Sequence, residues 1–283
     1  MIASDLQIIH PFDMEIKKSK PQSWTEEETL LALYLYFQLP FGKLHSGNPE
    51  IQQLAKAIGR SSNSVAMKLC NFASLDPKIT GTGRKGLAGA SKLDRETYSK
   101  FGNDWDGLVR RSEGLWRQYI FDDAQESSDR VAEAPVEFRF EPFLGNSTTR
   151  ATVNRRGGQG FFRRAVLANY SETCCITGLS DPRLLIASHI SEWSKDALNR
   201  HNPANGLLLS ATFDRAFECG LIAVDRKCVI HVSRQLLDSD NPANRNVFAP
   251  YQNCSLRAAV RFDPDPSLLE WHFANRFVDS MAA

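Results

Sequence analysis

Apolar residues recur at helical spacing near the start of the chain. A capping box at Thr25 and Glu28 precedes such a pattern and predicts an amphipathic helix over residues 24–37. The most apolar stretch of the chain, Leu30 to Phe37, is far shorter than the roughly 20 residues that cross a bilayer. We therefore expect a helical domain at this end and no membrane-spanning helix.

Two shorter apolar patterns follow and are joined by a tight turn. The first begins at Asn48 and ends at Gly59, and the second begins near Asn63. Two short helices with a glycine-containing turn are typical of a helix-turn-helix. The second helix is expected to turn Lys68 outward, which makes Lys68 a candidate DNA-binding residue. The alternative is a small helical bundle that serves as a spacer or binds a protein partner.

Charge changes sign along the chain although the total nearly cancels. The chain has 34 basic and 33 acidic residues, so contact with nucleic acid has to come from local basic patches. Residues 121–141 hold seven acidic side chains against two arginines, which predicts a solvated linker over residues 119–147. This linker separates a helical domain at 1–118 from a second domain at 148–283, and we expect the two to move independently.

A basic helix is predicted directly after this linker. Apolar residues between Phe161 and Tyr170 follow helical spacing, and the polar side of the same helix carries arginine. Such a surface suits contact with phosphates, although a solvated helix face is the alternative. The candidate DNA-binding residues here are Arg155, Arg156, Arg163 and Arg164.

The second domain combines short strands with a helix. Residues 183–190, RLLIASHI, predict a strand that ends near a histidine, and residues 206–210, GLLLS, predict a second strand after a polar loop. Residues 211–219 predict a helix, and a hairpin follows it. The whole chain is therefore expected to have an α+β fold with a helical, helix-turn-helix-like domain first.

This order of elements and residues resembles the HNH endonuclease family. The motifs that carry the resemblance are C-I-T-G at 175–178, A-S-H-I at 187–190, N-G-L-L-L-S at 205–210, D-R-A-F-E at 214–218 and G-L-I at 220–222. The resemblance implies a C-terminal ββα-metal nuclease domain. The helical first part looks like the N-terminal domain of restriction-type bacterial proteins.

The resemblance also implies roles for particular side chains. His189 corresponds to the first histidine and is the expected general base, because a neutral imidazole can take a proton from water. Asn205 is expected to hold the loop or the imidazole in position. Asp214 stands where the family has its last histidine and offers an oxygen ligand to Mg²⁺, or to Mn²⁺. Ser188 stands where many relatives bind metal through an acidic residue, and Glu218 follows Asp214 by one helical turn.

Each of these residues also has a structural interpretation. A histidine at the end of an apolar strand is commonly a hydrogen-bonded core residue, and an aspartate near a helix start stabilises the helix dipole. The loop adds Asp196 and His201 as further candidate metal ligands, because the expected metal site otherwise has few protein ligands.

Together these features predict a metal-dependent DNA endonuclease, with a role in restriction or defence against foreign DNA. One alternative is a DNA-binding regulator that has lost catalysis, and another is a nuclease effector subunit of a multi-protein system. DNA is the expected partner, with a homo-oligomer or a defence-system protein as further candidates. Six cysteines without a CxxC pair and an N-terminus without secretory features favour a cytoplasmic location.

Overall fold

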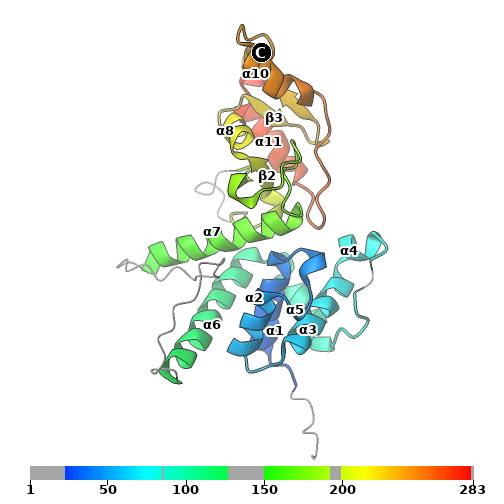
Figure 1. The fold of residues 1–283 in the computed structure, drawn as a ribbon, viewed down its shortest axis with the longest axis vertical. Coiled ribbons are helices and arrows are strands. Elements are labelled where there is room, and N and C mark those ends of the chain that lie inside the picture. Colours follow the sequence, from blue (N-terminus) through cyan, green and yellow to red (C-terminus); the bar gives the residue numbers. More distant parts are fainter. Residues whose placement is uncertain (1–22, 85, 127–149, 192–198, 282–283) are drawn as a thin grey trace, which may run out of the picture.

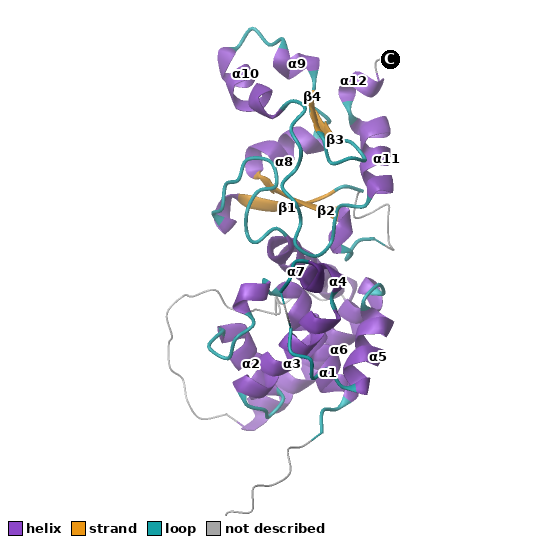
Figure 2. Cartoon of the chain, turned by 90° about the vertical axis from the view of Figure 1, so that its right-hand side faces the viewer, coloured by secondary structure: helices purple, strands orange, loops and turns teal. Residues whose placement is uncertain are grey.

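Two differently built parts make up the molecule, and one long helix lies between them (Figures 1 and 2). The structure is a computed structural model that describes residues 23–84, 86–126, 150–191 and 199–281. Of residues 120–126, 150–157 and 280–281 the backbone alone is described. The first part is helical, and the second holds two small antiparallel sheets among shorter helices.

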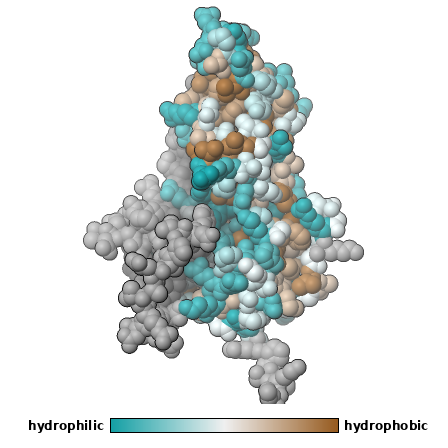
Figure 3. Space-filling model, viewed as in Figure 1, coloured by the Kyte–Doolittle hydropathy of each residue, from teal (hydrophilic) through white to brown (hydrophobic). Residues whose placement is uncertain are grey.

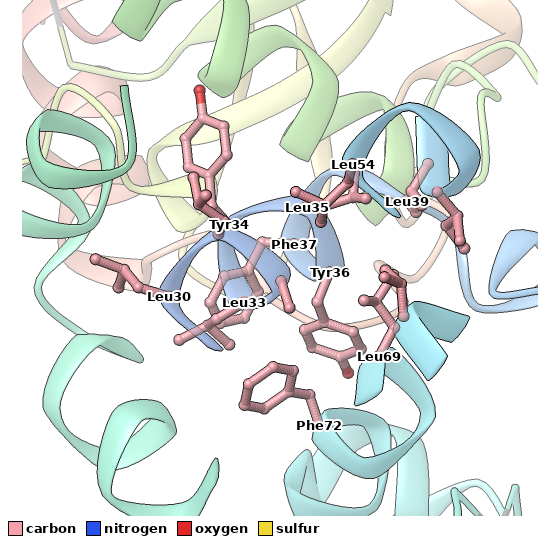
Figure 4. Close-up of a cluster of buried hydrophobic side chains, with 14 of the residues drawn as sticks. Leu30, Leu33, Tyr34, Leu35, Tyr36, Phe37, Leu39, Leu54, Leu69 and Phe72 are labelled. Atoms are coloured by element: carbon pink, nitrogen blue, oxygen red, sulfur yellow. The ribbon is translucent and has the colours of Figure 1, made fainter. Parts of the chain in front are cut away.

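The helical part is built around its first helix, α1. The helices here are α1 Glu26–Gln38, α2 Pro49–Ala57, α3 Ser62–Leu75, α4 Pro77–Gly81, α5 Lys92–Phe101 and α6 Trp105–Glu126. The predicted capping box is confirmed, since Thr25 and Glu28 each accept a hydrogen bond from the backbone N–H of the other. However, α1 is not amphipathic, because every residue from Glu28 to Gln38 is buried. Helices α3, α5, α6 and α7 contact it from several sides, and Figure 4 shows its side chains spreading around the axis.

Helices α2 and α3 form the predicted pair of helices with a short turn between them. Asn48 caps α2 through its side-chain oxygen, and Ser61 caps α3 in the same way. The expected outward orientation of Lys68 is wrong. Its side chain is 5% exposed and lies 2.5 Å from a carboxylate oxygen of Asp94, with the ring of Trp24 below it. Because Asp94 and Trp24 neutralise and cover the ammonium group, Lys68 belongs to the interior of the helical part.

The second part begins with helix α7 and continues with short elements. They are α7 Arg150–Asn169, β1 Leu185–His189, β2 Gly206–Ser210, α8 Ala211–Glu218, β3 Ile222–Val224, β4 Ile230–Val232, α9 Arg234–Leu237, α10 Pro242–Phe248, α11 Pro266–Arg276 and α12 Val278–Met281. Four 3-10 turns also occur in the described residues: Phe41–Lys43, Pro182–Leu184, Pro203–Asn205 and Ala249–Tyr251. The two predicted strands pair antiparallel as β1 and β2, and the predicted hairpin is β3 and β4.

Helix α7 belongs to the hydrophobic cores of both parts. Phe161 is buried in the helical core, where its ring stacks on Tyr34 with centroids 5.0 Å apart. Its neighbour Phe162 is buried in the core of the second part, beside Val166. Adjacent residues on a helix point about 100° apart, so one helix can serve two cores. This shared packing differs from the expectation that the two parts move independently.

A segment near the C-terminus adds a second attachment. Arg261 is 4% exposed, and its guanidinium donates to the backbone oxygen of Tyr36 at 2.8 Å and lies 4.2 Å from the centre of the Tyr36 ring. The backbone around Arg261 is held by Asn169, at the end of α7, which accepts from the N–H groups of both Arg261 and Phe262. The prediction of a linker from residue 119 is wrong at its start, because residues 119–126 continue helix α6. The rest of the predicted linker lies outside the described residues, so the attachment described here is made by these contacts.

Among the described helices none is long and apolar enough to span a bilayer. On the face drawn in Figure 3, polar and apolar residues are interspersed, and brown residues occur in both the upper and the lower half. Exposed apolar side chains of the second part include Leu179, Leu184 and Ile186 near β1.

Candidate active site

His189 lies at the end of β1, against helix α7. In the antiparallel pairing of β1 with β2, His189 lies opposite Gly206. The imidazole ring stacks on the ring of Phe162, with centroids 3.6 Å apart and planes 13° apart. A side chain on Gly206 would collide with Val166 and Phe162, at 2.5 and 2.9 Å. Glycine is therefore required where β2 crosses α7 opposite the histidine. Phe162 fixes the orientation of the imidazole from one face.

The hydrogen bond of His189 identifies which ring nitrogen can act as a base. Nε2 lies 3.0 Å from the backbone oxygen of Arg200. A carbonyl oxygen only accepts, so Nε2 carries the proton and Nδ1 carries the lone pair of the neutral ring. Burial lowers the pKa of the His189 imidazole below its usual 6.5, and the hydrogen bond to Arg200 offsets part of that effect. The ring is thus held neutral and in one tautomer near neutral pH.

Asn205 fastens the loop that follows β1. It is fully buried, and its side-chain oxygen accepts from the backbone N–H of Ser191 at 2.8 Å. Its amide group donates to the backbone oxygens of Ser191 and Asn199, both at 3.2 Å. Ser191 begins the loop and Asn199 follows residues 192–198, which lie outside the described residues. One amide therefore holds together the two ends of the loop that provides the partner of His189.

Asp214 lies in α8 beside Ser188, the residue that precedes His189. Its side chain is largely buried, and burial raises the pKa of the Asp214 carboxyl above its usual 3.8. A hydrogen bond from Ser188 acts in the opposite direction, while the negative charge of Glu218 adds to the rise. This is a carboxylate that a cation would stabilise, with a hydroxyl oxygen next to it.

The described residues therefore provide part of a metal site. Carboxylate and hydroxyl oxygens are ligands that suit Mg²⁺ or Mn²⁺. No cluster of three or more His, Cys, Asp or Glu side chains suited to a metal is present within the described ranges. Glu218 is exposed and forms an ion pair with Arg215 at 3.2 Å, and Asp196 lies outside the described residues. The side chain of His201 is turned toward Asp106 in helix α6, which differs from the metal-ligand role that the sequence suggested.

The arginines of α7 connect elements of the protein. Arg163 donates to the backbone oxygens of Leu185 and Pro182, at 2.8 and 3.0 Å, and so fixes the segment that leads into β1. Arg164 donates to the side chain of Gln38 in α1. These two contacts differ from the expected solvent-facing surface, because both flanks of α7 are covered. The side chains of Arg155 and Arg156 lie outside the described part of the structure.

Comparison with known families agrees with this geometry. Residues 174–225 match the family model of HNH endonuclease, which confirms the resemblance found in the sequence. The matched segment runs from Cys174 to Asp225 and includes His189, Asn205 and Asp214. No curated protein matches the chain. The C-terminal part thus carries an HNH endonuclease domain, whose family acts on nucleic acid.

Two contributors to the site were missed by sequence reasoning. Phe162 was assigned to a core but not to the imidazole that it stacks on. Arg200 acts through its backbone oxygen, and no side-chain pattern reveals a carbonyl as a hydrogen-bond partner. The one available signal was the adjacent pair Phe161 and Phe162, since neighbouring residues on a helix point about 100° apart and can therefore face two different cores.

Proposed function

We propose that this protein is a metal-dependent DNA endonuclease in which His189 is the general base. The observation that carries the proposal is the hydrogen bond from His189 Nε2 to the backbone of Arg200, within the segment that matches the HNH family. That bond leaves the basic nitrogen, Nδ1, as the position that can accept a proton from water.

The other candidate residues have supporting roles in this proposal. Asn205 holds the loop so that the carbonyl of Arg200 stays in reach of His189. Asp214 and Ser188 would hold Mg²⁺ or Mn²⁺, with Glu218 as a further oxygen one turn along α8. When bound, the cation neutralises charge on the phosphate and on the departing oxygen. The residues of the chain accept the proton of the attacking water and keep the imidazole oriented.

The biological role that we propose is restriction or defence against foreign DNA in the cytoplasm. Support comes from the resemblance of the whole arrangement to restriction-type proteins. In this proposal the α2–α3 pair contributes to DNA recognition as a helix-turn-helix-like unit, and Asn63 and Met67 are exposed on α3. Lys68 is not part of this surface. A homo-oligomer or a defence-system partner remains compatible with the proposal.

The test is cleavage of supercoiled plasmid by the purified full chain with Mg²⁺, Mn²⁺ or EDTA. We expect nicked or linear DNA with either cation and none with EDTA. His189→Ala should lower the rate by about 10² to 10⁴, the usual contribution of general-base catalysis. His231→Gln is the matched control, because His231 lies in β4 and pairs with Asp225.

Two results would contradict the proposal. Cleavage by His189→Ala at the rate of the unchanged chain would remove its assignment as the base. If the protein binds DNA but does not cleave it with either Mg²⁺ or Mn²⁺, the result favours a DNA-binding regulator instead.

A further inference from the structure

The loop of the candidate active site reaches the helical part of the molecule through His201. Its side chain is 8% exposed, and Nδ1 lies 3.3 Å from a carboxylate oxygen of Asp106, in α6. Burial lowers the pKa of His201 to about 4, so the ring is neutral near neutral pH. His201 is therefore packed against a residue that lies nearly a hundred positions earlier in the sequence.

Helix α7 provides the other side of this enclosure. A Cβ atom on Gly158 would lie 2.1 Å from His201 Nε2, so the imidazole rests directly on the helix backbone. Glycine inside a helix costs roughly 1 kcal/mol relative to alanine. The position of His201 is a physical reason for glycine here. Two residues on, a Cβ atom at Gly160 would meet nothing within 4 Å.

This enclosure is one peptide unit away from the partner of His189. His201 directly follows Arg200, whose backbone oxygen accepts the hydrogen bond from His189 Nε2 at 3.0 Å. The ring of His201 can be displaced only if its side chain rotates or its backbone moves. Since the side chain is covered by α6 and α7, movement of the Arg200 carbonyl is the direct consequence.

We propose that Asp106 and Gly158 seat His201, and that this seat positions the Arg200 carbonyl that holds His189 in its active tautomer. His201, Asp106 and Gly158 are then positioning residues. Through Asp106 the helical part contributes to the geometry of the nuclease site. The inference rests on the proposed function for its catalytic consequence. The positioning itself can be measured without catalysis.

The first experiment compares two glycine variants of the full chain. Gly158→Ala places a methyl group against His201, whereas Gly160→Ala places one in open space on the same helix. With DNA and Mg²⁺ saturating, we expect Gly158→Ala to lower the cleavage rate by about 10- to 100-fold, the size of loss that small misplacements cause. DNA affinity should stay within about twofold, because His201 is enclosed by protein. Gly160→Ala should cleave like the unchanged chain.

The second experiment observes the tautomer of His189 by NMR with ¹⁵N-labelled histidine. The chain contains six histidines, so the ring signals can be assigned by substitution. At about pH 8, above the usual histidine pKa of about 6.5, the unchanged chain should show His189 protonated on Nε2. Gly158→Ala and Asp106→Ala should each give a mixture of tautomers. Asp106→Asn keeps an oxygen acceptor and should restore the single tautomer, and Arg110→Ala is the control for loss of the Asp106–Arg110 ion pair.

A double variant separates this seat from a general effect on folding. Removing the ring with His201→Ala makes room for a methyl group at position 158, so adding Gly158→Ala should cause no further loss of rate. Thermal unfolding of each variant reports whether it is folded.

The outcomes distinguish the inference from the proposed function. If the unchanged chain cleaves DNA and Gly158→Ala retains both the rate and the single tautomer, the inference is overturned while the nuclease stands. If no variant cleaves but the tautomer of His189 depends on Gly158 and Asp106 as described, the positioning is supported and the proposed function fails.

Discussion

The two parts of this protein are stabilised in different ways. In the helical part, α1 is buried along almost its whole length, and aromatic rings from α3, α5 and α6 surround it. In the second part the elements are short, and buried amides fasten the irregular segments: Asn205 binds the loop after β1, and Asn169 binds the segment around Arg261. A buried loop needs partners for its backbone groups, which apolar packing cannot supply. The candidate catalytic residues lie in this second part, beside a loop that such an amide fastens.

Helix α7 is where the two kinds of stabilisation meet. Phe161 and Phe162 point into different cores, and Arg163 and Arg164 bind to different parts. Substitutions at these paired positions can therefore separate the contribution of each part.

The largest expected effect comes from truncating the two phenylalanines. Phe161→Ala and Phe162→Ala should each lower the free energy of unfolding by about 3–5 kcal/mol, because each removes a fully buried ring. Only Phe162→Ala should also lower the cleavage rate beyond its effect on folding, because Phe162 stacks on His189. Denaturant unfolding and cleavage at saturating DNA measure the two effects. Equal losses of rate in both variants would mean that the two cores are not distinct.

Much of the local structure could be predicted from the sequence. The capping box of α1, the two strands and the helix that carries Asp214 depend on residues close together in the chain. The order of His189, Asn205 and Asp214 was sufficient to recognise the HNH family.

Contacts between distant segments could not be predicted in the same way. From the sequence Lys68 resembles a solvent-facing residue, but in the structure Asp94 and Trp24 cover its side chain. The arginines of α7 formed a polar helix face in the sequence, but that face meets Gln38 on one side and the segment before β1 on the other. His201 suggested a metal ligand, and its contact with Asp106 depends on how the two parts pack. Each of these errors arose where tertiary packing determines the environment of a polar residue.

The next largest effect should come from the buried attachment at Arg261. Arg261→Ala removes a guanidinium that binds the backbone of Tyr36 and leaves Asp76 buried without that nearby positive charge. We expect a loss of about 2–4 kcal/mol in the free energy of unfolding. Limited proteolysis should show the two parts separating more readily. Arg257→Ala is the control, since Arg257 lies in the same segment with an exposed side chain.

If Arg261→Ala leaves both the unfolding curve and the proteolysis pattern unchanged, the packing of α7 alone holds the parts together. That result would mean that Phe161 and the residues packed around it provide the attachment between the two parts.

A smaller, pH-dependent effect is expected at Glu113, where α6 faces α1 and α7. Burial raises the pKa of Glu113 to about 7, although Arg117, Arg164 and a hydrogen bond from Tyr34 act in the opposite direction. The folded state therefore binds a proton more tightly than the unfolded state, whose carboxyl has a pKa near 4.5. The stabilisation is present below about pH 4.5 and is lost as the pH rises to about 7.

Glu113→Gln removes this dependence. Relative to the unchanged chain, the variant should gain on the order of 2 kcal/mol at pH values above this window and little below it. Thermal unfolding across the pH range measures the difference. A gain that is the same at all pH values would show that Glu113 does not titrate in this window.

The smallest effect is expected from the exposed ion pairs that also bridge the two parts. Lys78 pairs with Asp263, and Lys43 pairs with Glu172 at 2.5 Å, but all four side chains are more than a third exposed. Exposed pairs contribute about 0–1 kcal/mol because water screens the charges and the long side chains lose freedom. Lys78→Ala and Lys43→Ala should therefore each shift the free energy of unfolding by less than about 1 kcal/mol, and added salt should reduce the shift further. A loss as large as that of Arg261→Ala would contradict the view that buried contacts, and not surface charges, join the helical part to the nuclease part.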